Sequence, residues 1–325
     1  DPREGLRRGA AGNTPTSPLP ANRGSGLRHA VLGAGGVGGL LAAALARAGE
    51  DVVVLMRGEA LRRYSGHLHV HSVVLGTFTT DVEGAAMLDD PVDVLWVTTK
   101  STGLDESLAA APPEAVGSAL VVPLLNGLDH VTRLRRDYDR VSAAAIRVET
   151  ERTAPGRIRQ VSPFLTVEVA PHRDTPAGRA VVDEVATVLT AAGIPATVRD
   201  DELGVLWDKF ALLAPVALAT TGLDAPLGAV REDARYAGCQ EEVFALALRD
   251  GASTDPEAVR RMVRAAPEEM RSSMQKDVEQ GRTPELDAIA GGILRRAASY
   301  EVPIPCTEAL IALILKRLGT VSGGG

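Results

Sequence analysis

The stretch Gly33-Ala34-Gly35-Gly36-Val37-Gly38 decides the fold of this chain. A short apolar run at residues 29–32 precedes it, a helix-forming run at 40–48 follows it, and a second strand of the buried type spans residues 51–56. Strand, glycine-rich turn, helix and strand in this order form a βαβ unit of about the expected length. A GxGxxG pattern alone is a weak signal, but in this setting it indicates a Rossmann-type dinucleotide-binding domain.

Each glycine of the motif has its own task in such a domain. Gly33 permits a tight turn, Gly35 lets the backbone approach a pyrophosphate, and Gly38 lets the helix lie close to the sheet. The free N–H groups and the positive end of the helix dipole then face the phosphates. We therefore predict that the whole motif binds the cofactor, through Gly33, Ala34, Gly35, Gly36, Val37 and Gly38.

The choice between NAD and NADP is read at the end of the second strand, about 20 residues beyond the motif. An NAD enzyme places an acidic residue there to hold the ribose hydroxyls, whereas this chain has Arg57. A guanidinium suits a 2′-phosphate, and Arg62 and Arg63 add positive charge nearby. One alternative is that Glu59, two residues further on, holds the ribose hydroxyls of NAD. Another is that Arg57 is an ordinary solvated surface arginine. The sequence favours NADPH as the cofactor.

The 325 residues suggest two domains, and the character of the sequence changes near residue 200. Residues 1–27 are rich in Pro, Gly, Ser and Arg and are predicted to be a disordered extension. Residues 28–200 alternate strand-like and helical runs and form the predicted NADP-binding Rossmann domain. Residues 201–325 are predicted to be helical and to form a second domain. The expected fold is thus an α/β Rossmann-type domain followed by an all-α C-terminal domain.

Composition narrows the classes of partner. The formal net charge of −7 argues against nucleic acid or an anionic membrane. The longest apolar run, residues 210–219, is too short to span a membrane and contains Pro215. Two isolated cysteines, Cys239 and Cys306, fit the reducing cytoplasm. We expect a cytoplasmic enzyme that acts on a small molecule.

Three polar side chains stand where chemistry is expected. Lys100 and Asn126 each follow a strand, and ligands of open α/β sheets bind beyond the carboxyl ends of the strands. The alternatives are a solvated lysine and an ordinary Asn-Gly turn. Lys209 begins an apolar stretch, where a desolvated amine would have a lowered pKa and could donate a proton. By itself, this segment also fits a lysine whose amine reaches solvent from a helix end.

A metal site is not expected. His67, His69 and His71 alternate on a predicted strand and therefore share one face. Three imidazoles can bind a metal, but the solvent face of a two-sided strand explains them more simply. No GxSxG motif occurs, and no Ser-His-Asp arrangement can be recognised.

The sequence resembles the ketopantoate reductases (2-dehydropantoate 2-reductases) from about residue 28 to its C-terminal helices. Each mark of the resemblance is modest, but their order and spacing are specific. The marks are Gly33-Ala34-Gly35-Gly36-Val37-Gly38, Val97-Thr98-Thr99-Lys100, Leu125-Asn126-Gly127, Trp207-Asp208-Lys209, Ser272-Ser273-Met274, Asp277, Glu285-Leu286-Asp287 and Gly291.

The resemblance implies NADPH-dependent reduction of a 2-keto acid and a C-terminal domain like that of 6-phosphogluconate dehydrogenase. It also implies a homodimer, with residues 201–325 as the substrate and dimerisation domain. It implies that Lys209 donates the proton and that Ser273 binds the substrate. Glu285 resembles the acidic residue near both the cofactor and the lysine. Lys100 and Asn126 resemble cofactor-contacting residues, and Asn126 is also placed beside the substrate.

The sequence departs from the family pattern on the helix of the lysine. The family carries asparagines four and eight residues after the lysine, and this chain has Leu213 and Ala217 there. A pocket that lacks polar partners loses selectivity for a polar substrate. An enzyme of a biosynthetic pathway that reduces another ketone or an imine is therefore an alternative. A non-catalytic NADP sensor is a second alternative, against which the retention of Lys209, Ser273 and Glu285 argues.

Overall fold

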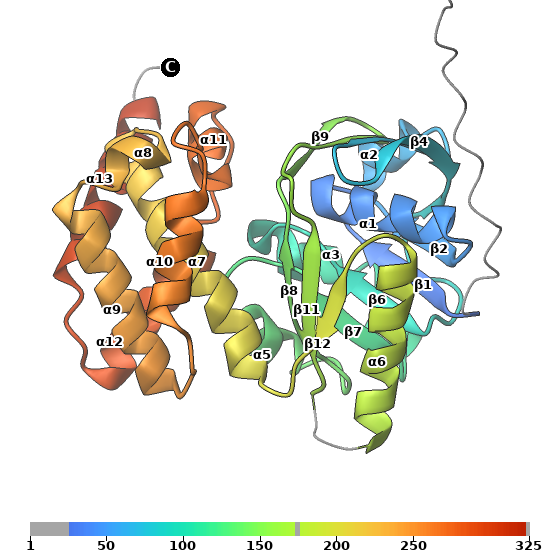
Figure 1. The fold of residues 1–325 in the computed structure, drawn as a ribbon. Helices are drawn as coiled ribbons and strands as arrows, with labels where there is room; N and C mark the ends of the chain where they lie inside the picture. Colours follow the sequence, from blue (N-terminus) through green and yellow to red (C-terminus); the bar gives the residue numbers. More distant parts are fainter. Residues whose placement is uncertain (1–25, 173–175, 323–325) are drawn as a thin grey trace, which may run out of the picture.

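A parallel sheet forms the centre of the N-terminal half of the protein in the computed structural model, which describes residues 26–172 and 176–322 (Figure 1). Its five strands lie in the order β5-β2-β1-β6-β7 within this described part. Most of the extension predicted at residues 1–27 lies outside the described residues. The strands are β1 (Arg28–Leu32), β2 (Asp51–Leu55), β5 (Glu83–Ala85), β6 (Val94–Val97) and β7 (Leu120–Pro123).

Helices cover both faces of this sheet because successive side chains of a strand point to opposite sides. Val31 and Trp96 belong to the core that includes α1 and α6, whereas Leu32 and Leu95 belong to the core that includes α3, α4 and α5. The short α2 and the 3-10 turn η1 lie in connections that follow strands. The elements are α1 (Gly36–Arg47), α2 (Gly58–Arg62), η1 (Ser101–Gly103), α3 (Leu104–Leu108), α4 (Pro113–Val116), α5 (His130–Leu134) and α6 (Pro176–Ala191).

Two further sheets complete the α/β half. A three-stranded sheet of order β12-β11-β8 lies beside β7, to which the bridge between Val121 and Val141 joins it. A four-stranded sheet of order β4-β3-β10-β9 packs against α1. The strands are β3 (His67–Ser72), β4 (Gly76–Asp81), β8 (Ala143–Arg147), β9 (Thr150–Ala154), β10 (Arg157–Gln160), β11 (Thr166–Ala170) and β12 (Ala196–Val198).

The C-terminal half is a set of helices around α7 (Glu202–Leu223), which contacts α8, α9, α10, α11 and α13 (Figure 1). The same helix also contacts β8 and β11, so it belongs to the interface between the halves. The predicted division between residues 200 and 201 falls between β12 and α7. The remaining elements are α8 (Leu227–Val230), α9 (Ala234–Asp250), α10 (Pro256–Ala265), α11 (Ser273–Glu279), the π-helical turn η2 (Asp287–Gly291), α12 (Gly292–Tyr300) and α13 (Pro305–Ser322).

Helix α7 is longer than the apolar run seen in the sequence, because it continues through Pro215 without a break. Among the described helices, α7 is the one whose 22 residues are long and apolar enough to cross a membrane, judged by length and composition alone. However, 67% of its most apolar window is buried inside the protein. The helix is thus the core of the helical half. The predicted fold class, a Rossmann-type α/β domain followed by a helical domain, is confirmed.

Candidate active site

The glycine-rich turn leaves room for a dinucleotide at the start of α1. Gly33 has φ of +101°, which favours glycine, and an added Cβ at Gly38 would collide with the Gly33 carbonyl oxygen. Gly35 differs, since an added Cβ there would meet no protein atom within 4 Å. Gly35 is also the N-cap of α1, and as a glycine it has no side chain that could cap the helix. The first N–H groups of α1 are therefore left to bind phosphate oxygens. These features fit a bound pyrophosphate.

Arg57 lies at the position predicted for the reader of the 2′-phosphate. It is the N-cap residue of α2, shortly after β2, and its side chain is 57% exposed. Its guanidinium forms an ion pair with Glu106 of α3. The rival residue Glu59 lies beside Arg63 instead, at 3.6 Å. Arg57 is therefore available at the sheet edge, although a phosphate would have to compete with Glu106.

Glu285 connects the helical half to the carboxyl ends of β6 and β7. Its Oε1 accepts hydrogen bonds from the backbone N–H of Ser101 at 2.7 Å and from the Ser101 hydroxyl at 2.8 Å. Its Oε2 accepts a hydrogen bond from the Asn126 side chain at 3.1 Å. The adjacent Lys100 forms an ion pair with Asp277 of α11 at 2.7 Å. The structure thus brings Asn126 into contact with Glu285 and places Lys100 next to them, paired with Asp277. It adds Ser101, which sequence reasoning missed beside Lys100.

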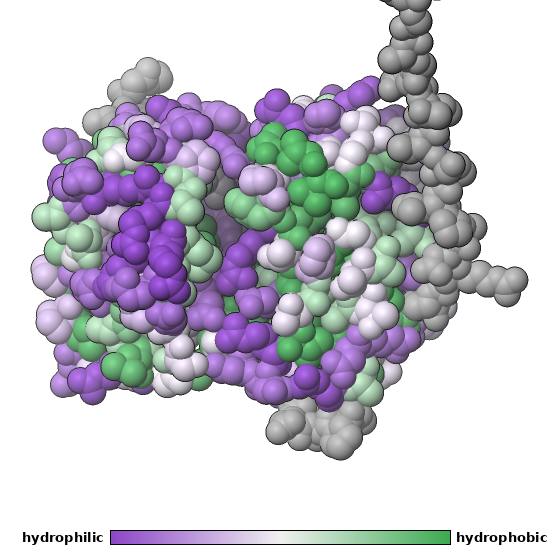
Figure 2. All heavy atoms as spheres, viewed as in Figure 1, coloured by the Kyte–Doolittle hydropathy of each residue, from purple (hydrophilic) through white to green (hydrophobic). Residues whose placement is uncertain are grey.

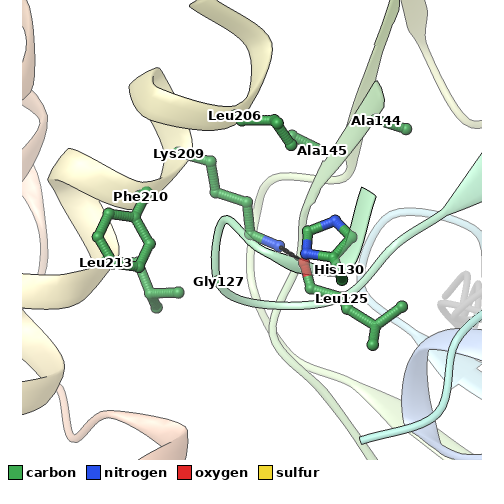
Figure 3. A pocket seen from close by; sticks show the side chains of 9 residues that line it. All are labelled: Leu125, Gly127, His130, Ala144, Ala145, Leu206, Lys209, Phe210 and Leu213. Atoms are coloured by element: carbon green, nitrogen blue, oxygen red, sulfur yellow. Dashed lines mark hydrogen bonds between the residues drawn. The ribbon is translucent and has the colours of Figure 1, made fainter. Parts of the chain in front are cut away.

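Lys209 extends from α7 towards the loop after β7. Its Nζ donates a hydrogen bond to the backbone oxygen of Leu125 at 3.2 Å (Figure 3). Although the whole residue is only half-buried, protein atoms surround its amine, and burial lowers the pKa of Lys209 from 10.5 to about 8. Glu285 counteracts this shift and Arg147 adds to it. The amine is therefore a usable acid near neutral pH.

The first turns of α7 are fixed by a polar group inside the helical half. The Trp207 indole N–H donates to the Asp250 carboxylate at 2.9 Å, and Arg296 donates to the same carboxylate oxygen at 2.9 Å. Trp207 also meets Phe210 edge to face, with ring centroids 5.6 Å apart. These contacts hold the residues on both sides of Lys209, so the direction of its side chain is set by a rigid helix.

A small pocket surrounds the Lys209 amine at the junction of α7, β8 and the loop after β7 (Figure 3). Leu213 belongs to its wall, whereas Ala217 is 1% exposed and packs into the helical core. The expectation that both residues face the substrate therefore fails for Ala217, which lies one turn beyond the pocket. His130 is a lining residue that sequence reasoning missed, although it stands four residues after Asn126. The lining residues are Leu125, Gly127, His130, Ala144, Ala145, Leu206, Lys209, Phe210 and Leu213.

The predicted substrate serine is separate from this pocket. Ser273 is exposed at the first residue of α11, and it is not among the residues that line the pocket of Lys209. Its neighbour Ser272 is buried and shares a hydrogen bond of 2.8 Å with Thr220 of α7. The hydroxyl of Thr220 also donates to the Val216 carbonyl, so it is not open to a substrate.

The two halves approach each other closely around the site. Gly127 has φ of +96°, and an added Cβ would lie 2.6 Å from the backbone oxygen of Ala288 in η2. Asp129 accepts hydrogen bonds from Arg295 at 2.7 Å and from Arg296 at 2.8 Å, both on α12. Figure 2 shows a recess between the halves that hydrophilic side chains border. The close contacts of Gly127 and Asp129 with η2 and α12 therefore hold the two halves together beside this recess.

The three histidines of β3 form hydrogen bonds with side chains of the neighbouring strand β4. The Nδ1 atoms of His67, His69 and His71 hydrogen-bond to side chains of β4, which are Asp81, Thr79 and Thr77 respectively. Within the described ranges, no group of three or more potential ligands is placed to hold a metal ion. The histidines therefore form the outer face of a sheet whose other face covers α1.

Two family models together match most of the chain. The model "Ketopantoate reductase PanE/ApbA" matches residues 29–173, and the model of its C-terminal domain matches residues 201–317. The chain belongs to the ketopantoate reductase family. It is 29% identical to the 2-dehydropantoate 2-reductase of Caulobacter vibrioides, over 88% of this chain and 97% of that protein.

Solved structures agree with this family. The ketopantoate reductase of Ralstonia eutropha matches with a TM-score of 0.81 and 27% identity, over 91% of this chain and all of that one. A D-mandelate dehydrogenase with bound NADH matches with a TM-score of 0.82 at 19% identity, which shows a shared fold. This ketopantoate reductase family member is an oxidoreductase acting on a CH–OH group, and its cofactor is a nicotinamide dinucleotide, NADPH in this family.

Replacing Arg57 with Asp is expected to weaken NADPH binding far more than NADH binding, because only NADPH has the 2′-phosphate. Loss of charge-assisted hydrogen bonds to a phosphate corresponds to roughly tenfold to hundredfold in Kd. Fluorescence titration with both cofactors measures this difference. Arg261→Asp is the matched control, since Arg261 is also an exposed arginine but lies on α10 in the helical half. An equal loss for the two cofactors in Arg57→Asp would show that Arg57 does not read the phosphate.

Proposed function

We propose that this enzyme reduces a 2-keto acid with NADPH and that its substrate is 2-dehydropantoate (ketopantoate), which becomes pantoate. The observation that carries the proposal is the buried amine of Lys209, held by the Leu125 carbonyl beside the carboxyl ends of the strands. A reductase needs an acid at this place, because hydride addition to a ketone leaves an alkoxide that must be protonated.

The proposed mechanism uses the residues of the interface in separate roles. The bound nicotinamide supplies the hydride, and the protein supplies orientation and electrostatics. Lys209, as the ammonium ion, donates a hydrogen bond to the ketone oxygen and transfers its proton to that oxygen as negative charge develops there. Its fixed hydrogen bond to Leu125 leaves two N–H groups for other partners.

The remaining predicted residues support this step. Glu285 raises the pKa of Lys209 and so favours the charged acid, and its hydrogen bonds fix Asn126 at the sheet edge. Asn126 and Lys100 are proposed to contact the cofactor, and Asn126 also to contact the substrate. Ser273 is proposed to bind the substrate carboxylate from the start of α11, across the recess from the sheet. The separation of Ser273 from the pocket means that substrate would occupy the space between them.

A ketone or imine other than ketopantoate is the second candidate, and Leu213 favours it. Leu213 lines the pocket where the family pattern has an asparagine, so this part of the wall is apolar. A more apolar substrate would pack against it without leaving a polar group unpaired. A non-catalytic NADP sensor is supported less well, because a sensor has no use for a desolvated amine.

We also propose, from the family resemblance, that the enzyme serves pantothenate biosynthesis in the cytoplasm as a homodimer. The two cysteines are free thiols, which is consistent with a reducing compartment. Exposed leucines on α9 and α13, Leu248 and Leu315, support a contact through the helical half. Analytical ultracentrifugation gives the mass, and a monomer at micromolar concentration would exclude the homodimer.

Lys209→Met is expected to abolish most of the activity while raising Tm at pH 7. Loss of a proton donor of this kind lowers kcat by about 10²–10⁴-fold. The folded-state pKa of about 8 lies below the ordinary 10.5, so at pH 7 the buried charge carries its full desolvation cost, which methionine removes. The measurements are NADPH oxidation at 340 nm and a thermal melt.

Lys316→Met, at an exposed lysine of α13, is the matched control and is expected to change neither quantity. Retention of more than half of the activity by Lys209→Met would exclude Lys209 as the acid. Loss of activity together with a lower Tm would instead indicate that the lysine stabilises the fold.

Leu213→Asn is expected to raise kcat/KM for ketopantoate roughly fivefold, the equivalent of one hydrogen bond of about 1 kcal/mol. The substitution restores a polar side chain to the pocket wall. Leu203→Asn, at an exposed residue of the same helix, is the control for the effect of asparagine on α7. A folded Leu213→Asn enzyme with unchanged or lower efficiency, together with a faster apolar keto acid or imine, would favour the second candidate.

A further inference from the structure

His130 has a polar side chain without a described function. It is the first residue of α5 and is only 6% exposed, and its imidazole points into the pocket beside the Lys209 amine (Figure 3). Within the part of the chain that the structure describes, neither Nδ1 nor Nε2 of His130 has a hydrogen-bond partner. A buried polar group without a partner costs stability, so this imidazole calls for an explanation.

One of the three N–H groups of the Lys209 ammonium has no partner assigned to it, after the Leu125 carbonyl and the proposed substrate oxygen are counted. An ammonium carries three donors. The Leu125 carbonyl takes one, and the proposed mechanism directs a second to the substrate oxygen. Glu285 acts on Lys209 through its charge, while its oxygens accept hydrogen bonds from Ser101 and Asn126, and among the described contacts none is a hydrogen bond from the Lys209 amine to Glu285. Among the residues that line the pocket, His130 has the only polar side chain apart from Lys209 itself.

The charge state of His130 suits it to accept this hydrogen bond. Burial, reinforced by the charge of Lys209, lowers the pKa of His130 to about 3, while Asp129 acts in the opposite direction. The imidazole is therefore neutral at any ordinary pH and has one nitrogen lone pair to offer. The other charged groups that act on the pair are Glu285 and Arg147.

We propose that His130 is a positioning residue that accepts a hydrogen bond from the Lys209 ammonium and so directs the remaining N–H of that group to the substrate oxygen. The pocket that both residues line has a volume of about 10 Å³, which is room for roughly one water molecule to carry the hydrogen bond from Lys209 to His130. The proposal rests on the proposed role of Lys209 as the acid. It extends that role by naming the group that fixes the direction of the proton.

Loss of this acceptor has consequences that differ from those of a packing defect. A misdirected acid slows the proton-transfer step, so kcat falls while KM for the keto acid changes little. The ammonium form of Lys209 also loses a stabilising partner, so the pKa of the lysine falls further. Reduction needs the protonated lysine, and the upper pH limit of activity therefore moves downwards.

The test compares His130→Leu with His130→Asn and His130→Gln in the full-length enzyme. Initial rates of NADPH oxidation with a 2-keto acid are measured from pH 6 to pH 10. We expect His130→Leu to lower kcat about tenfold to a hundredfold and to lower the pH midpoint by about one unit. The side-chain oxygen of Asn or Gln corresponds to one of the two ring nitrogens. The variant that places an acceptor correctly is expected to recover most of kcat and the wild-type midpoint.

The outcomes separate this proposal from the role of Lys209 itself. A wild-type enzyme without a pH midpoint near 8 would overturn the proposed role of Lys209. A normal wild-type profile with an unchanged His130→Leu profile would overturn the role of His130 alone. A raised KM with an unchanged midpoint would also overturn it and would place His130 against the substrate. If His130→Leu does not fold, as its thermal melt shows, His130→Ala replaces it, since that change adds no bulk.

Discussion

Desolvation of one amine constrains the rest of this structure. Burying an ammonium ion costs desolvation free energy. In this protein α7, β8 and the loop after β7 surround the amine of Lys209. The Leu125 carbonyl provides the fixed partner, and Glu285 provides the compensating charge. These partners come from both halves of the chain. The proposed acid is therefore assembled only when the two halves are in contact.

Helix α7 connects stability to chemistry. Its apolar length forms the core of the helical half, and its first turns reach the sheet of the other half. Asp250 holds Trp207 near the start of this helix and also holds Arg296, which reaches across to Asp129 at 2.8 Å. Asp129 directly precedes His130. One chain of hydrogen bonds thus fixes the elements that carry both Lys209 and His130.

The sequence alone predicted those elements that depend on residues close together in the chain. The βαβ unit around Gly33–Gly38 follows from chain order and glycine spacing, and the position of Lys209 on a helix follows from the apolar run after it. The strands β4, β5, β9 and β10 were not predicted, because β5 has only three residues and the other three are mostly polar, without the apolar run of a buried strand. Such strands form only when neighbouring strands pair with them.

The missing parts of the candidate site depend on contacts between distant segments. Ala217 repeats the helical spacing of Leu213, yet the pocket ends before it, and no sequence pattern marks where a pocket ends. Glu285 accepts hydrogen bonds from Ser101, which is 184 residues away in the sequence, and from Asn126, which is 159 residues away. His130 had a weak signal, its closeness to Asn126, but only the folded structure reveals that it lines the same pocket as Lys209.

The pH dependence of kcat/KM for NADPH-dependent keto acid reduction in the wild-type enzyme is the most direct test of a desolvated lysine acid. Burial lowers the pKa of Lys209 from 10.5 to about 8, so the amine is protonated below pH 8 and loses its proton above it. The rate of reduction should therefore be level below about pH 8 and fall about tenfold per pH unit above it. A rate that stays level to pH 10 would mean that no such lysine supplies the proton.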